Sequence, residues 1–285
     1  MSHPTYRDRE LPLFTRIENV VSWTLMTSLL ANRVSIVTGG SSGIGRGIAL
    51  EFAREGATVV VADVQEAPKV GKFFDTDLTT TTVSEIERLG ARGEFAQTDV
   101  TQDSQVENLI VQTVERYGRL DILVNNVGIY IPGDIHTLST QDWDRMTQTN
   151  YRSVYVACKH AATHVNRSAA GRIINIASVQ AFAGGGGPAY PGSKAAVVNF
   201  TRDLALQLAP NGTTVNAICP GFIETPVQDY QTSAEIEMSR KRTPLPRFGT
   251  PRDIGRAAVF LASDDAEWIT GTCLTVDGGW RASVF

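Results

Sequence analysis

Apolar residues along this chain alternate between short continuous runs and helically spaced patterns. The runs are rich in β-branched residues, as in strands that are buried on both faces of a parallel sheet. They lie at 33–38, 58–62, 95–100, 120–124, 172–177, 214–219 and 273–276. Apolar residues spaced three or four apart, which is typical of helices, lie at about 48–53, 83–89, 106–114, 141–165, 191–208 and 251–262. This alternation predicts an α/β fold, a doubly wound parallel sheet of about seven strands with helices on both faces.

Three stretches interrupt the alternation. Residues 1–16 are polar and read as a loose arm, and a near-helical apolar pattern over 17–30 predicts a short helix packed on the body or on a neighbouring subunit. Residues 65–82 read as a surface loop, and the polar residues from 226 to 250 as a mobile segment. We therefore divide the chain into an N-terminal arm, 1–31, and one domain, 32–285.

Composition narrows the class of protein. Hydrophobic residues make up 42% and charged residues 20%, which suits a globular protein with a sizeable core. A net charge of −4 gives no case for nucleic-acid binding, and no apolar run reaches the roughly 18 residues that span a bilayer. The N-terminus mixes arginines with acidic residues and does not resemble a targeting peptide. The three cysteines are widely spaced, so we expect neither disulfides nor a metal site, and a cytoplasmic location.

The first strand leads into a glycine-rich turn, Gly39 to Gly45, then a helix, a second strand and Asp63. This order is that of a mononucleotide-binding βαβ unit of the Rossmann type. One glycine makes the turn, one lets the backbone approach a pyrophosphate, and one lets helix and strand pack closely. The free N–H groups at the helix start would hold the pyrophosphate.

Asp63 favours NAD over NADP. A carboxylate at this position accepts hydrogen bonds from the ribose hydroxyls and repels a 2′-phosphate. Ser42 and Val64, at positions where an arginine or lysine would bind a 2′-phosphate, are neutral. Lys69 and Lys72 lie downstream in a segment that the pattern does not place, so NADP is the less favoured alternative.

Tyr190 and Lys194 lie four residues apart at a predicted helix start, directly behind the glycine run 184–187. On a helix this spacing puts both side chains on one face, about one turn apart. The ammonium and the helix N-terminus would favour the phenolate and lower the pKa of the tyrosine from about 10 toward neutrality. The pair is then a candidate for exchanging a proton with a substrate oxygen. The alternative is a solvated helix start with no chemical role.

Polar residues also follow several other predicted strands, at the edge where an open α/β sheet binds its ligands. Asp99 and Val100 could border an adenine, and the Asn125–Gly128 motif and Ser178 end two further strands. Asn150 is a polar residue in an apolar helical pattern. Each of these residues could instead be a turn former or a helix-bending polar residue.

Together these motifs resemble those of the short-chain dehydrogenase/reductase family, in its compact single-domain branch. The resemblance rests on Thr38 through Gly45, Asn125 to Gly128, Ser178, Tyr190 with Lys194, and Pro220 to Thr225, and it covers about residues 32–280. Val127 stands where the family usually has alanine. The N-terminal arm and the long segment after Asp63 are further departures, and neither touches the chemistry motifs.

The resemblance implies roles for the matching residues. Tyr190 would be the general acid or base, Lys194 would tune it and hold the nicotinamide ribose, Ser178 would bind the substrate oxygen, and Asn150 would anchor a water that links Lys194 to solvent. The residues implied to bind the cofactor are Gly39, Ser41, Ser42, Gly43, Ile44, Gly45, Asp63, Asp99, Val100, Asn126, Gly128, Tyr190, Lys194, Pro220, Gly221, Ile223 and Thr225. The family also implies a homotetramer, in which the tail 280–285 could approach a neighbouring active site.

The expected reaction is the NAD-dependent interconversion of a secondary alcohol and a ketone. Substrate contacts are expected from Tyr130, Val179, Gln180, Phe182, Phe222 and Tyr230, and from a substrate-binding segment at about 222–250. Because most of these residues are apolar or aromatic, we expect a medium-sized hydrophobic substrate such as a terpenoid, steroid-like or polyketide compound. The alternatives are a polyol or sugar dehydrogenase, since Gln180, Glu224 and Gln228 could bind hydroxyls, and a nucleotide-binding scaffold without redox turnover.

Overall fold

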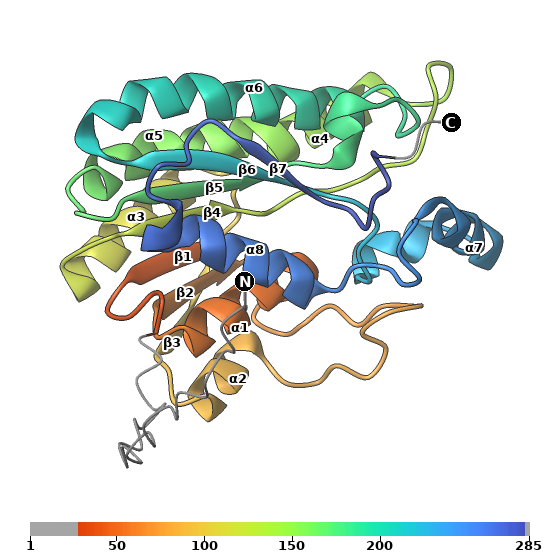
Figure 1. Ribbon diagram of the computed structural model, residues 1–285. Coiled ribbons are helices and arrows are strands. Elements are labelled where there is room, and N and C mark those ends of the chain that lie inside the picture. The colour runs from red at the N-terminus through yellow and green to blue at the C-terminus, as the bar shows by residue number, and fades with distance from the viewer. Residues whose placement is uncertain (1–27, 283–285) are drawn as a thin grey trace, which may run out of the picture.

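Seven parallel strands form the centre of the molecule. A computed structural model describes residues 28–282, and Figure 1 shows their arrangement. The strand order across the sheet is β3-β2-β1-β4-β5-β6-β7. The strands are β1 (Val34–Thr38), β2 (Thr58–Asp63), β3 (Gly93–Gln97), β4 (Ile122–Asn125), β5 (Arg172–Ile176), β6 (Thr214–Pro220) and β7 (Cys273–Val276). This order confirms the expected doubly wound sheet of the Rossmann type.

Helices cover both faces of the sheet, as the alternation predicts (Figure 1). One layer contains α1 (Gly43–Arg54), α2 (Thr82–Arg88) and α8 (Pro251–Ala262), and its apolar side chains pack with those on one face of β1, β2, β4, β5 and β6. The other contains α3 (Asp103–Tyr117), α5 (Ser153–Val165) and α6 (Tyr190–Leu208). The short helices η2 (Val179–Phe182), η3 (Ala209–Asn211) and η5 (Asp264–Ala266) complete the connections. The core therefore lies in two layers, one on each face of the sheet.

The helix expected over 141–165 is interrupted. It consists of α4 (Thr140–Thr147), a π-helical turn η1 (Gln148–Arg152) and α5. The side chain of Asn150 in this turn bonds both backbone groups of Ile129, which is a contact that the helical spacing of the sequence does not reveal. Single π-helical turns inside α-helices occur frequently at functional sites.

Three other expectations about elements need correction. The third strand ends at Gln97 rather than 100, because residues 98–100 already turn toward α3. The segment 226–250 is partly helical: η4 (Pro226–Tyr230) is followed by α7 (Ser233–Arg242), which a reciprocal Thr232–Glu235 capping box begins. Residues 29–32 form a turn and not the end of a helix, and the rest of the helix expected over 17–30 lies outside the described residues.

The edge that carries the candidate site is set by the strand order. From β1 the chain winds outward through β2 and β3, then returns to β4 on the other side of β1. Connections therefore leave β1 and β4 in opposite directions, and a crevice opens at their carboxyl ends. The glycine turn follows β1, and the Asn125–Gly128 motif begins in the last residue of β4.

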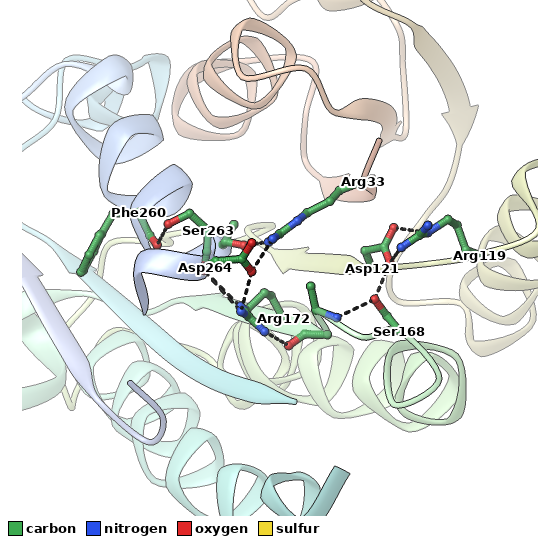
Figure 2. A network of polar contacts seen from close by, with 11 residues as sticks. Arg33, Arg119, Asp121, Ser168, Arg172, Phe260, Ser263 and Asp264 are labelled. Atoms are coloured by element: carbon green, nitrogen blue, oxygen red, sulfur yellow. Dashed lines mark hydrogen bonds and ion pairs between the residues drawn. The ribbon is translucent and has the colours of Figure 1, made fainter. Parts of the chain in front are cut away.

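An ion network ties the strands together at the opposite edge (Figure 2). The guanidinium groups of Arg33 and Arg172, both buried, converge on Asp264. Arg33 also donates to the backbone oxygen of Ala262, and Arg172 to that of Ser263. The end of α8 is thus anchored to the starts of β1 and β5.

Candidate active site

The glycine turn between β1 and α1 has the shape of a cradle for a phosphate group. Gly39 and Gly43 adopt φ angles of 66° and 51°, which other L-residues rarely adopt. At Gly45 a Cβ atom would lie 2.1 Å from the backbone oxygen of Gly39. The hydroxyl of Ser41 is buried in this turn and has no partner within the described residues. These residues fit the pyrophosphate of a dinucleotide, which would supply the missing partner.

Asp63 ends β2 beside this turn. One carboxylate oxygen accepts a hydrogen bond from the backbone N–H of Ser41 at 3.1 Å, and the other from that of Val64 at 2.8 Å. Burial raises the pKa of Asp63, and these backbone bonds act in the opposite direction. The carboxylate is therefore held at the rim of the turn, where an adenosine ribose would lie.

The other wall of the crevice comes from the ends of β4 and β6. Asn126 donates to the backbone oxygens of Thr38 and Gly39, at 2.9 and 3.2 Å, and so joins the end of β4 to the glycine turn. Across the crevice the Thr225 side chain lies 3.2 Å from where a Cβ of Gly43 would be. The predicted cofactor residues at these two positions are thus brought against the glycine turn.

The rest of the segment after β6 is tightly constrained. At Gly221 a Cβ would lie 2.7 Å from that of Asp277, and the N–H of Gly221 donates to Val276. Pro220 ends β6, and Ile223 is buried. Only glycine fits where the chain turns beside the final strand.

The two residues expected beside the adenine lie just after β3. Asp99 accepts hydrogen bonds from the backbone N–H and the hydroxyl of Thr101, at 2.9 and 2.7 Å, and Val100 is buried. They lie in the turn that leads to α3, at the same carboxyl edge of the sheet as Asp63.

Tyr190, Ser178 and Lys194 are brought together at the carboxyl end of β5. Ser178 follows this strand, and Tyr190 is the first residue of α6, with Lys194 one turn further on. The Lys194 ammonium donates to the backbone oxygen of Ile176 at 2.9 Å and lies 5.9 Å from the centroid of the Tyr190 ring. The helical spacing thus places both side chains on one face of α6, as expected.

The electrostatics of this trio differ from the expectation. Burial raises the pKa of Tyr190 to about 12, and a hydrogen bond with the Ser178 side chain lowers it only in part. Burial also lowers the pKa of Lys194 to about 8. Both shifts have the same cause, because a site poor in water disfavours the charged form of either group. The structure therefore corrects the expected lowering of the Tyr190 pKa: the phenol is neutral at physiological pH.

Asn150 is fully buried and positions the backbone beside Lys194. Its oxygen accepts the N–H of Ile129 at 2.8 Å, and its amide donates to the Ile129 oxygen at 2.9 Å and to the Ser193 hydroxyl at 3.2 Å. Gly128 precedes Ile129 in the chain, and a Cβ at Gly128 would lie 3.1 Å from the Lys194 nitrogen. The role expected for Asn150, as anchor of a water, stays a prediction.

Two aromatic rings form a small cluster with Tyr190. The Tyr130 ring packs edge-on against it, with centroids 5.5 Å apart, and the Tyr230 ring lies 4.4 Å from that of Tyr130. Tyr130 comes from the loop after β4 and Tyr230 from η4. One predicted substrate residue, Tyr130, thus borders the Tyr190 ring, and a second, Tyr230, packs on Tyr130.

Other predicted substrate residues have partners of their own. Phe222 stacks on the buried Phe248, with centroids 3.9 Å apart, so its ring is held against a residue of the segment 226–250. The side chain of Val179 is buried. Half-exposed Gln180 is different, because its side-chain oxygen is buried and has no partner among the described residues.

Two neighbours of the site were not foreseen from the sequence. Arg281 places its guanidinium 4.1 Å from the ring centroid of the predicted substrate residue Phe182, so the tail contacts the active-site region of its own chain. The Phe74 ring packs edge-on against Phe222 at 6.4 Å. Neither contact has a local signal, because each joins segments that are far apart in sequence.

Residues 28–282 contain no group of three or more histidine, cysteine or acidic side chains that is placed to bind a metal ion. Within the same range, no helix has the length and apolar character needed to cross a membrane.

Comparison with known proteins places the geometry in context. A family model described as enoyl-(acyl carrier protein) reductase matches residues 39–281. The chain is 36% identical to (2S)-[(R)-hydroxy(phenyl)methyl]succinyl-CoA dehydrogenase subunit BbsD of Thauera aromatica, over 88% of this chain and 97% of that protein. It is 35% identical to 2,5-dichloro-2,5-cyclohexadiene-1,4-diol dehydrogenase LinX of Sphingobium indicum, over 91% of this chain and 100% of LinX.

The fold of the chain is also similar to that of a solved structure. Aldohexose dehydrogenase of Thermoplasma acidophilum superposes with a TM-score of 0.77 at 34% identity, over 90% of this chain and 97% of that one. The matches cover nearly the full length of each relative.

Proposed function

Because this chain belongs to the short-chain dehydrogenase/reductase family of oxidoreductases, we propose that it interconverts a secondary alcohol and a ketone, with NAD as the hydride carrier. The observation that carries the proposal is the grouping of Tyr190, Ser178 and Lys194 at the strand edge that also holds the glycine turn. A proton-transfer group thus lies in the crevice that would receive the nicotinamide.

The chain's own residues suit ketone reduction and its reverse. The nicotinamide, when bound, supplies or accepts the hydride. Tyr190 is neutral at physiological pH, so its phenol can donate a proton to the oxygen of a ketone. The Ser178 hydroxyl, which interacts with that phenol, would donate to the same oxygen as negative charge develops on it. In alcohol oxidation Tyr190 would first have to lose its own proton to solvent. The charge of Lys194 would stabilise the resulting phenolate, which then accepts the proton of the alcohol.

The role of Tyr190 is tested by Tyr190→Phe, which removes one oxygen and leaves the ring in contact with Tyr130. Turnover should fall by about 100-fold or more, the usual contribution of a general acid or base, while the affinity for NADH stays within about twofold. Steady-state kinetics with a panel of alcohols and ketones and a fluorescence titration with NADH measure the two quantities. Substantial residual turnover would contradict the assignment. Tight NADH binding by the unmodified protein without turnover on any substrate would favour the nucleotide-binding scaffold.

The choice of NAD rests on Asp63 and is tested separately. Asp63→Asn keeps an oxygen that can accept the Ser41 N–H but removes the charge that would repel a 2′-phosphate. The variant should bind NADH more weakly and narrow the preference for NADH over NADPH by about tenfold. Titration with both reduced nucleotides measures this, and an unmodified enzyme that prefers NADPH would overturn the proposal.

For the substrate we propose a medium-sized hydrophobic secondary alcohol or ketone, of a terpenoid, steroid-like or polyketide kind. The ring of Tyr130 beside Tyr190 and the ring of Tyr230 beside Tyr130 support this, since aromatic faces pack well against apolar carbon. The names of BbsD and LinX describe a hydroxyl next to a phenyl group and a diol on a six-membered ring. Ring-bearing alcohols are therefore the first compounds to screen.

A second candidate is a polyol or sugar. It is favoured by the buried side-chain oxygen of Gln180, which lacks a partner among the described residues and could accept a hydrogen bond from a substrate hydroxyl. The similar solved structure of an aldohexose dehydrogenase, whose name describes a sugar substrate, also favours this candidate. Gln180→Leu should raise KM for a hydroxyl-rich substrate and leave KM for a hydrophobic alcohol nearly unchanged.

We also propose a homotetramer in the cytoplasm. The ring of Phe200 on α6 packs edge-on against those of Tyr151 in η1 and Tyr155 on α5, and Tyr155 is half-exposed. A cluster of this kind on the outer face of two helices suits burial against a second copy. Light scattering coupled to size-exclusion chromatography measures the mass, and a monomer would contradict the assembly.

A further inference from the structure

Residues 65–81, here called the strap, cross from the cofactor turn to the substrate-binding segment. The strap's path is visible in Figure 1 as the long orange loop between β2 and α2, which extends toward α7. At its far end the Lys72 N–H donates to Asp229 at 2.9 Å, and Gly71 lies against Pro226. The ring of Phe74 packs on Phe222. The outer part of the strap is therefore attached to the substrate-binding segment.

The return end of the strap is anchored on α1. The buried guanidinium of Arg46 donates to the hydroxyls of Thr80 and Thr82, at 3.2 and 3.1 Å. The Thr82 hydroxyl donates in turn to the backbone oxygen of Gly40 in the glycine turn, at 2.8 Å. Because both ends of the strap are held, the backbone between them has a defined position.

Between these attachments, Lys69 is held directly at the glycine turn. Its backbone N–H donates to the Ser42 hydroxyl at 2.6 Å, and Ser42 is the residue that precedes the first turn of α1. The Lys69 side chain is exposed, and among the described residues no carboxylate or aromatic ring pairs with its ammonium. The flexible four-carbon stem of a lysine lets the charge reach an anion that lies on the N–H groups of α1.

We propose that Lys69 binds a phosphate group of the dinucleotide, a proposal that rests on the nucleotide-binding function proposed above. The buried and unpartnered hydroxyl of Ser41 marks the adjacent turn as a place where a ligand group is missing. An ammonium brought to this turn adds the positive charge that Ser42 and Val64 do not provide. The strap thereby contributes a cofactor-binding residue from outside the βαβ unit.

Lys72 provides a matched control in the same strap. Its side chain is also exposed, but its ammonium lies 4.6 Å from the centroid of the neighbouring Phe73 ring. Lys69→Gln and Lys72→Gln therefore make the same change of charge three residues apart. Neither substitution removes a buried group, so both variants should fold, and circular dichroism verifies this.

The experiment is a fluorescence titration of the unmodified enzyme and both variants with NADH and with NADPH, at low and high salt. Lys69→Gln should raise the Kd about three- to fivefold at low salt, with a smaller effect at high salt. Lys72→Gln should leave both Kd values within about 1.5-fold of the unmodified enzyme, because its charge is engaged elsewhere.

The two nucleotides identify which phosphate is bound. Equal weakening of NADH and NADPH by Lys69→Gln would support contact with the diphosphate, and weakening of NADPH alone would support contact with the 2′-phosphate. If Lys69→Gln binds both nucleotides as tightly as the unmodified enzyme, or no more weakly than Lys72→Gln, the proposal is overturned and the proposed function is untouched. An unmodified protein that binds neither nucleotide would overturn both.

Discussion

At the scale of single residues, burial is the dominant influence on the chemistry of the site. Lys194 is 3% exposed, and burial lowers the pKa of its ammonium to about 8. Burial raises the pKa of the Tyr190 phenol, which likewise favours the neutral form of that group. At pH 7 the phenol is neutral and the ammonium is still charged, but the pKa of the ammonium lies close enough to neutrality that a charged reactant entering the site can change its protonation.

This burial has a measurable cost in stability. Below about pH 8 Lys194 is charged in both the folded and the unfolded protein, so the folded state bears the full penalty of the buried charge. Between about pH 8 and 10.5 the folded protein alone loses the proton, and the penalty fades. Lys194→Met should therefore raise the free energy of unfolding at pH 7 by about 1–3 kcal/mol, with the gain shrinking as the pH rises through that window.

Urea unfolding of both proteins at pH 7 and at pH 10 tests this expectation. The matched control is Lys159→Met on the exposed face of α5, which should change the free energy of unfolding by less than about 0.5 kcal/mol at either pH. A Lys194→Met variant that is less stable than the unmodified protein at pH 7 would show that the bond to the Ile176 oxygen outweighs the cost of the charge.

At the scale of elements, the helix that carries the glycine turn is held by a close crossing with α8. A Cβ at Gly255 of α8 would lie 2.6 Å from the backbone oxygen of Gly47 in α1. At Gly47 a Cβ would lie 2.5 Å from the Pro251 backbone. Glycines let the two helix backbones approach this closely, which keeps the start of α1 at the end of β1.

Gly255→Ala should therefore destabilise the protein by about 1–3 kcal/mol, since the added methyl meets backbone that cannot move aside easily. The control is Gly192→Ala in α6, where a Cβ meets no atom within 4 Å and φ is not positive. That change should be neutral or stabilising by up to about 1 kcal/mol, because alanine favours the helix. Thermal unfolding compares the two, and equal effects of both substitutions would contradict the close crossing.

At the scale of the whole molecule, the carboxyl and amino ends of the strands carry different kinds of contact. The carboxyl edge carries the candidate active site, and the opposite edge carries buried ionic contacts (Figure 2). There the fully buried Asp121 accepts hydrogen bonds from the Arg119 guanidinium at 2.7 Å and from the Val34 N–H at 2.8 Å, and it also contacts the Ser168 hydroxyl. We therefore expect that substitutions among these contacts change the free energy of unfolding without changing catalysis.

Asp121→Ala should lower the free energy of unfolding by about 3 kcal/mol, because a buried N–H and a hydroxyl lose their acceptor. The folded fraction should keep the KM values of the unmodified enzyme. Asp103→Ala, which removes an exposed ion pair with Arg152, should leave the free energy of unfolding nearly unchanged. Chemical unfolding and steady-state kinetics measure both variants, and a changed KM in Asp121→Ala would mean that the two edges are coupled.

Features that depend on local pattern were predictable from the sequence. The sheet, the glycine turn, the position of Asp63 after β2 and the pairing of Tyr190 with Lys194 follow from hydrophobic periodicity and short motifs, because each depends on residues near one another in the chain. Helix α8 and strand β7 have the predicted bounds for the same reason.

Features that depend on distant contacts were decided by the tertiary structure alone. The π-helical turn at Asn150 exists because its side chain bonds Ile129, and the strap is placed by its bonds to Ser42 and Asp229. The direction of the Tyr190 pKa shift was mistaken. The four-residue spacing to Lys194 reveals that a positive charge lies nearby, but it does not reveal that folding removes water from around the phenol. Solvation is a property of everything packed around a group, so it is settled only when the chain has folded.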